Sequence, residues 1–326
     1  MASISRLAQR LLKRPPSPLH QILTTGFHVL EKGQLIEEER LPHYSPTQFF
    51  PVNIGDGLNA RYQVVGKLGH GGNSTAWLSR DLNEHKYVTV KVCRRESEQV
   101  TREINAYRHL NTLTTSHVGA LLIREMTDSF DISNAHGRYP FDGDRTIYKS
   151  RSLVITKNPG RPVITDFGEA RIGQQTYDDD IQPFQYRAPE VIMGMPWSYE
   201  VDIWNVGVMI WDLFYDKNMF HTRGPDGIPD SLYHMAHITA LLGPAPLDFL
   251  ERSHSKRRLE YYDQNGKWKG LAEIPQTSLE ESEENLDGED KGQFLEFIRK
   301  MLKWRPEERS SAEELLEDTW LRSETT

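Results

Sequence analysis

Two side chains far apart in this sequence could act together on a charged ligand. Lys91 lies in the strand-like stretch KYVTVKVC, where an ammonium group on one face can bind an anion. Asp166 follows the apolar run Val163 to Thr165 and precedes Phe167 and Gly168. A carboxylate at the end of a short buried strand suits a hard divalent cation that keeps its waters. Together they predict a site for a metal-bound anion, although each alone also fits a surface lysine or a plain D-x-G turn.

A glycine-rich turn precedes the lysine. Gly69 and Gly71 lie in LGHGGNSTAW, between two β-rich stretches. Without a Cβ, such glycines let backbone N–H groups approach phosphate oxygens. Glu103 follows on EQVTREINAYRHLNTL, whose apolar residues recur with helical spacing, which places it on a predicted helix. Taken with the glycine turn and Lys91 in this order, Glu103 is the candidate carboxylate to hold the lysine. The alternatives are an ordinary glycine hairpin and an exposed glutamate.

The elements around these residues change character along the chain. Strand patterns begin near Arg61, and residues 118–132 alternate in strand-like segments. Beyond residue 165 the chain turns helical. Residues 199–215 are apolar nearly all round and predict a buried helix, and two amphipathic helices follow near the C-terminus. A β-rich part followed by an α-rich part predicts an α+β fold in two lobes.

Composition narrows the classes of function. The 326 residues carry a net charge of −8, which argues against bulk nucleic-acid binding and permits basic protein partners. No apolar run is long enough to span a bilayer, and one cysteine excludes an internal disulfide framework. The first thirty residues lack Asp and Glu, and Ile4, Leu7 and Leu11 share one helical face. This resembles a mitochondrial presequence, but we favour a disordered or docking tail and a cytoplasmic or nuclear location.

Further motifs complete a family pattern. Ala188-Pro189-Glu190 follows in YRAPEVIMG, Asp202 in VDIW and Arg309 in PEERSSAEELL. With RYQVVGKLGHGGNSTAWLSRDL, PVITDFGEA and FIRKMLKWRPEERSSAEELLEDTWL, the motifs occur in strict order over residues 61–320. The chain resembles the eukaryotic protein kinases, and its details look closest to the SR-protein kinases, particularly their fungal relatives.

The resemblance implies a bilobal kinase fold, with an N-terminal extension over 1–55, an N-lobe over 56–140 and a truncated C-lobe over 141–326. It implies ATP with Mg²⁺ and transfer of the γ-phosphoryl group to Ser or Thr of a protein, with basic Arg-Ser-rich substrates. The residues that it places at ATP are Gly69, Gly71, Ser74, Ala76, Lys91 and Glu103, with Asp166 on the metal.

Two residues of the glycine loop depart from the family pattern. Ser74 replaces its third glycine, and Ala76, in the place of the usual Val, would cover less of an adenine ring. The same pattern gives the later motifs structural roles. It implies a buried ion pair between Glu190 and Arg309, and a capping role for Asp202 on backbone amides near the catalytic centre. Surface salt chemistry is the alternative for all three.

The pattern breaks immediately before Asp166. A kinase places an H-R-D-x-x-x-x-N loop there, whose Asp accepts the substrate proton and whose Asn holds a second magnesium. No histidine in this chain begins an H-x-D, and the stretch between Tyr139 and Phe167 is too short for a strand, a hinge, two helices and this loop. One such helix across a ~30 Å lobe takes about twenty residues. The sequence therefore predicts that one continuous block is missing near 139–141.

Asp142 and Asp144 are close enough in sequence to be weighed as a substitute base. Neither has the partner Asn or the neighbouring Lys, so a solvated D-G-D turn is the favoured interpretation. Three hypotheses stay open: an active Ser/Thr kinase, a catalytically dead pseudokinase or scaffold, and an incomplete copy of an active kinase. Loss of the block also predicts that helix 199–215 exposes apolar side chains.

Overall fold

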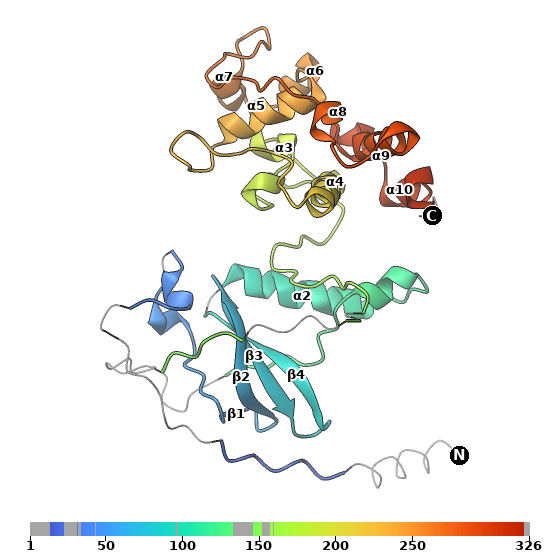
Figure 1. The fold of residues 1–326 in the computed structure, drawn as a ribbon. Helices are drawn as coiled ribbons and strands as arrows, with labels where there is room; N and C mark the ends of the chain where they lie inside the picture. Colours follow the sequence, from blue (N-terminus) through green and yellow to red (C-terminus); the bar gives the residue numbers. More distant parts are fainter. Residues whose placement is uncertain are drawn as a thin grey trace. The chain divides into compact units, whose positions relative to one another are not determined.

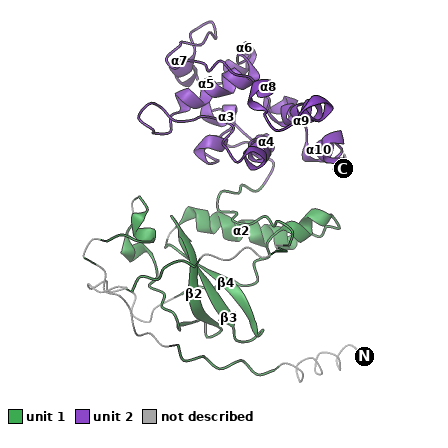
Figure 2. Cartoon of the chain, viewed as in Figure 1, with its two compact units in different colours: residues 1–172 green, residues 173–326 purple. Residues whose placement is uncertain are grey.

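The computed structural model describes residues 14–22, 31, 34–42, 44–95, 97–132, 146–151, 157–158 and 160–322. It divides the chain into two compact units, Met1–Ile172 and Gly173–Thr326, called unit 1 and unit 2 below (Figure 2). The described residues do not include Ile4, Leu7 and Leu11, the junction at 139–141, Asp142 or Asp144.

Unit 1 is built on an antiparallel four-stranded sheet with the strands in sequence order (Figure 1). The strands are β1 (Gly57–Leu58), β2 (Tyr62–Gly71), β3 (Ser74–Asp81) and β4 (Lys86–Cys93). Side chains alternate between faces along β3, where Trp77 is buried against the small core and Ala76 points the other way. Ala76 lies opposite Lys91 and Leu78 opposite Thr89, so these four residues share the second face.

One long helix, α2 (Glu98–Thr112), follows the sheet (Figure 1). Its buried residues are Glu103, Ala106 and Tyr107, so the carboxylate that the sequence selected lies on the inward face. Three short 3₁₀ helices complete the regular structure of the unit: η1 (Glu38–Arg40), η2 (Pro46–Gln48) and η3 (Val118–Leu122).

The strands expected within residues 118–132 are a wrong prediction. Val118–Leu122 forms η3, and Ile123 makes one parallel bridge to Ile164. The strand expected at 163–165 is reduced to that bridge, and its side chains are not buried, since Val163 is 40% and Ile164 59% exposed. A pairing one residue long gives neither segment a neighbour that would cover its apolar side chains.

The boundary between the two units falls between residues 172 and 173 of the chain, later than the lobe boundary expected at 140/141. The described residues between 146 and 172 pack on unit 1. Tyr148 lies edge-on to Trp77, and the Arg151 N–H donates to the Lys67 carbonyl. The metal-site candidate Asp166 therefore belongs to the same compact unit as Lys91.

Unit 2 is helical, as predicted. Its helices are η4 (Phe184–Tyr186), α3 (Pro189–Ile192), α4 (Glu200–Tyr215), α5 (Ser231–Leu242), α6 (Leu247–Leu250), α7 (Ser255–Tyr261), α8 (Leu279–Ser282), α9 (Gly288–Met301), η5 (Pro306–Glu308), α10 (Ala312–Leu316) and α11 (Thr319–Arg322). Trp204, Trp211, Phe249 and Phe294 lie in its apolar core. A Cβ on Gly207 would come within 3.0 Å of Met301, so glycine permits the close approach of α4 and α9.

Helix α4 is buried on one face only, which corrects the expectation of a wholly buried helix. Val201, Trp204, Val208 and Trp211 face the core. On the other side Val206 is 38%, Met209 44% and Leu213 77% exposed. This is the exposed apolar face that loss of a packing partner predicts. None of the described helices is long and apolar enough to cross a membrane.

Candidate phosphate and metal site

Lys91 is the centre of the candidate site. Its Nζ donates to both carboxylate oxygens of Glu103, at 2.9 and 2.7 Å, and to Oδ1 of Asp166 at 2.9 Å. An ammonium group has three N–H donors, so all three are engaged. β4 presents the lysine, α2 the glutamate, and the turn after the Ile164 bridge the aspartate. The structure thus brings together three residues that the sequence selected from positions 75 residues apart.

The turn at Asp166 is conformationally strained. Its φ is 65°, in the left-handed region that a residue with a Cβ rarely adopts, at a cost of about 1–2 kcal/mol. The ring of Phe167 meets Tyr107 of α2 edge-on at 5.1 Å, and Gly168 lies against Gln99. These contacts hold the strained turn against α2, and strain of this kind tends to occur where a side chain must be aimed.

The electrostatics keep Lys91 charged. Burial lowers its pKa, but the hydrogen bonds and charges of Glu103 and Asp166 outweigh burial, so the pKa is raised above its ordinary value of 10.5. The lysine is therefore an ammonium over the whole physiological range, as an anion site requires. Burial also raises the pKa of the neighbouring Cys93 thiol to about 11, which makes that thiol an unreactive neighbour rather than a nucleophile.

A cavity of about 140 Å³ adjoins the lysine. It is lined by Gly71, Gly72, Asn73, Ser74, Lys91, Gln99, Val100, Glu103, Asp166 and Gly168. Asn73 and Gln99 were not selected from the sequence. They hydrogen-bond to each other. The sequence offered two signals for them: Asn73 comes directly after the glycines, and Gln99 lies in the first turn of the predicted helix.

The glycines of this turn are not required by packing. A Cβ built on Gly69, Gly71 or Gly72 meets no atom of the described residues within 4 Å, and none of the three has a positive φ. Open space beside the backbone amides, a fixed ammonium and a carboxylate together fit a phosphate group with a divalent cation. Mg²⁺ is commonly held by one or two carboxylates plus phosphate oxygens, and Asp166 supplies one such carboxylate. Ser74 lines the cavity, whereas Ala76 lies on the sheet face beside it.

Three residues with predicted structural roles, Glu190, Asp202 and Arg309, lie in unit 2. Arg309 donates to Glu190 at 2.6 and 2.7 Å, with both side chains at most 1% exposed, and also to the carbonyl of Glu200. The buried ion pair is therefore present. For Asp202 no side-chain hydrogen bond is found among the described residues, so it caps no described amide, and desolvation of its carboxylate raises its pKa.

A second cluster of charges in unit 1 has the donor atoms of a metal site. Glu37, Glu38 and His70 offer ligand atoms within 4.8 Å of one another. The ammonium of Lys67 already lies among them, 3.4 Å from Glu37 and paired with Glu38, and its side chain is 1% exposed. Ser150 donates its hydroxyl and its N–H to Glu37. This cluster is an ion-pair network that joins the N-terminal segment to β2, since a buried ammonium repels a cation.

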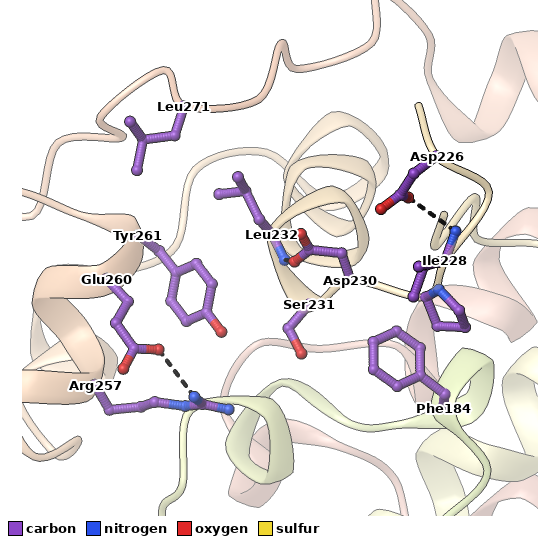
Figure 3. Close-up of a pocket in the computed structure, with 11 residues that line it drawn as sticks. Phe184, Asp226, Ile228, Asp230, Ser231, Leu232, Arg257, Glu260, Tyr261 and Leu271 are labelled. Carbon is purple, nitrogen blue, oxygen red and sulfur yellow. Dashed lines mark hydrogen bonds and ion pairs between the residues drawn. The ribbon is translucent and has the colours of Figure 1, made fainter. Parts of the chain in front are cut away.

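Unit 2 has a cavity of about 450 Å³ on its own surface (Figure 3). Phe184, Asp226, Asp230, Glu260 and Tyr261 are among the residues that line it. Each of the three carboxylates already has a local partner: the first two accept backbone N–H groups and Glu260 pairs with a neighbouring arginine. Three carboxylates and one guanidinium, that of Arg257, line the cavity together with aromatic and aliphatic side chains, so its lining carries a small excess of negative charge.

Comparisons with known proteins identify the family. Residues 149–321, more than half of the chain, match the protein kinase domain. The chain belongs to the protein kinase family. A serine/threonine protein kinase of Aspergillus fumigatus is 39% identical over 395 aligned positions, covering 98% of this chain and 99% of that protein. Serine/threonine-protein kinase SRPK of Physarum polycephalum is 28% identical over 59% of this chain and 46% of its own length. SRSF protein kinase 3 of Mus musculus is 29% identical over 48% and 28%.

The alignment with the Aspergillus fumigatus kinase is longer than this chain. It runs over 395 positions, while 98% of this chain is about 319 residues, so about 75 positions have no residue of this chain opposite them. Two helices that each cross a lobe take about forty residues. A gap of this total length can hold those helices together with a strand, a hinge and a catalytic loop, which is the block that the sequence predicts to be missing.

Proposed function

We propose that this chain is a nucleotide-binding pseudokinase, which binds Mg²⁺ with ATP but does not by itself transfer the γ-phosphoryl group. The observation that carries the proposal is the ammonium of Lys91 held between Glu103 and Asp166 beside an open glycine turn. The sequence lacks the H-R-D loop, so no base and no second magnesium ligand stand at the usual place.

In this proposal each residue of the site has a separate role in binding the nucleotide and the metal. Backbone amides of the glycine turn and Lys91 would hold phosphate oxygens, Glu103 would orient the lysine, and Asp166 would hold the metal. The cation, when bound, offsets the negative charge of the phosphates. Phosphoryl transfer relies on positioned charges and an oriented nucleophile, and this chain retains the first and lacks the second.

The second candidate is an active Ser/Thr kinase, the function named for its relatives, acting on basic Arg-Ser-rich protein substrates. The carboxylates around the unit 2 cavity and the net charge of −8 favour a basic partner. Asp144 would then have to serve as the base. A protein partner, a cytoplasmic or nuclear location and no direct contact with nucleic acid belong to both candidates.

The test uses the purified full chain with ATP, Mg²⁺ and an Arg-Ser peptide. Nucleotide binding is measured by calorimetry and transfer by radiolabelled phosphate. We expect binding that Asp166→Ala weakens at least about tenfold, no weakening in the matched exposed variant Asp131→Ala, and no transfer. Transfer that disappears in Asp166→Ala but survives in Asp144→Ala would overturn the pseudokinase proposal and exclude the substitute base. Sequencing transcripts across codons 139–141 shows whether a longer, active form is also made.

A further inference from the structure

The candidate phosphate cavity is small for a whole nucleotide. Pockets for small-molecule ligands usually hold about 300–1,000 Å³ and are largely apolar. This one holds about 140 Å³, and Val100 is the one aliphatic side chain among its lining residues. The rest are glycines, amides, a hydroxyl and charged groups. Its size and chemistry match the phosphate part of a nucleotide.

The sheet face beside the cavity offers little to a base. Ala76 and Leu78 of β3 lie opposite Lys91 and Thr89 of β4, so these four residues form the face that continues from the lysine. Thr89 is exposed, and Ala76 presents a single methyl group. Leu78 is the one large apolar side chain among these four, so an aromatic ring on this face would bury less apolar area than on a face lined by several such side chains.

Base selectivity also requires hydrogen-bond partners at the edge of the ring. In the family these are backbone groups of the hinge, and the sequence predicts that the hinge belongs to the missing block. The gap of about 75 positions in the alignment is large enough to include it. A site that hydrogen-bonds a ring edge can discriminate strongly, whereas one that touches only phosphates cannot.

We propose that unit 1 recognises the magnesium-bound polyphosphate chain of a nucleotide and does not distinguish one base from another. The inference rests on the proposed function, because it takes the same site and names its ligand class. Adenine, guanine or no base at all should make little difference to affinity, while the phosphates and the cation carry the binding.

The ion pairs around Lys91 indicate how the ligand enters. All three donors of the ammonium are engaged, so a phosphate oxygen must displace one carboxylate. Asp166 is the contact that can be given up, because its side chain is 73% exposed and that of Glu103 only 11%. When the Asp166 carboxylate leaves Lys91, it becomes free to bind the cation. The same exchange therefore opens Lys91 to the phosphate and Asp166 to the Mg²⁺.

The experiment titrates the full chain by calorimetry at fixed Mg²⁺ with ATP, GTP, inorganic tripolyphosphate and adenosine. We expect dissociation constants for ATP, GTP and tripolyphosphate within about threefold of one another, and no measurable binding of adenosine. Removing Mg²⁺ with EDTA should weaken all three at least about tenfold. Lys91→Ala should weaken all three alike, and Lys86→Ala, an exposed lysine on the same strand, should weaken none.

The outcomes separate the two proposals. Binding of ATP at least about tenfold tighter than GTP and tripolyphosphate would overturn the loss of base selectivity and leave nucleotide binding intact. No binding of any phosphate ligand would overturn the proposed function, and the inference with it. Equal binding that Lys91→Ala does not weaken would show that the anions bind elsewhere, and would overturn the assignment of the site.

Discussion

The two units differ in what holds them together. Unit 2 gathers large apolar side chains from α4, α5, α6 and α9 around one core, with the Glu190–Arg309 pair sealed inside it. Unit 1 has a small core on one face of a four-stranded sheet, and its other ties are charged: Lys67 with Glu37 and Glu38, and Lys91 with Glu103 and Asp166.

This difference suggests that unit 2 contributes mainly to stability and that unit 1 contributes the binding site. Burial of apolar area stabilises without direction, whereas ion pairs aim side chains at defined points. The candidate site lies in the unit held by charges, and α4 of the other unit keeps an apolar face exposed. Substitutions in the core of unit 2 should therefore lower the free energy of unfolding, and those in the glycine turn of unit 1 should lower the affinity for phosphate ligands.

The largest expected effect is on unit 2. Arg309→Ala leaves the carboxylate of Glu190 buried without its partner, so the free energy of unfolding should fall by about 3–5 kcal/mol. Urea denaturation followed by tryptophan fluorescence measures this, because six of the seven tryptophans lie in unit 2. The matched control is Lys217→Ala, at an exposed pair with Glu284, which should change the free energy by less than about 0.5 kcal/mol. Equal effects of the two variants would contradict a sealed core.

Lys67→Ala tests the charged ties of unit 1. It leaves Glu37 and Glu38 buried without their cation, at a cost of about 3 kcal/mol confined to that unit. Hydrogen exchange should show faster exchange in β2 and β3 and unchanged exchange in α4 and α9. Lys86→Ala, at the exposed end of β4, is the control and should leave both regions as they are. Faster exchange in both units would mean that the units unfold as one.

Acid should weaken unit 2 through His234. Neither ring nitrogen of this fully buried residue has a hydrogen-bond partner within the part of the chain that the structure describes, and burial lowers its pKa to about 3. The unfolded chain binds the proton near pH 6.5 and the folded one does not, so stability is present above 6.5 and falls as pH decreases. Between pH 6.5 and 4.5 the loss is about 2 kcal/mol.

The acid effect is measured as the difference in unfolding free energy between those two pH values. His234→Leu should abolish most of it, while the exposed His254→Gln should not. A slope that His234→Leu leaves unchanged would assign the acid sensitivity to carboxylates instead.

The smallest effect on stability comes from Gly71→Ala. No atom of a described residue lies within 4 Å of the added Cβ, so stability should rise by at most about 0.5 kcal/mol, while tripolyphosphate affinity falls several-fold. Gly227→Ala is the reverse case: at φ +76° it should cost about 1 kcal/mol and leave binding unchanged. A thermal melt and a titration of each variant complete the test. Lower stability without lower affinity in Gly71→Ala would contradict the separation of the two roles.

Much of the candidate site was predictable from single residues. The Lys91–Glu103 contact and the Glu190–Arg309 pair both followed from the family motifs, while periodicity predicted only that Lys91 lies on a strand and Glu103 on a helix. The short strands were not predictable. Residues 118–132 and 163–165 have apolar residues with strand-like spacing, but a strand needs a paired neighbour, and here one bridge is all that forms.

The family and the order of the motifs could be predicted from residue types and their spacing along the chain, and on the same basis the missing block stays a prediction. Only the tertiary structure decided that Asp166 belongs with Lys91 in unit 1, that Lys67 fills the cluster at Glu37, and that α4 keeps an exposed face. These properties depend on contacts between residues far apart in sequence. The sequence alone does not show whether a given carboxylate, lysine or leucine has a partner in the folded protein.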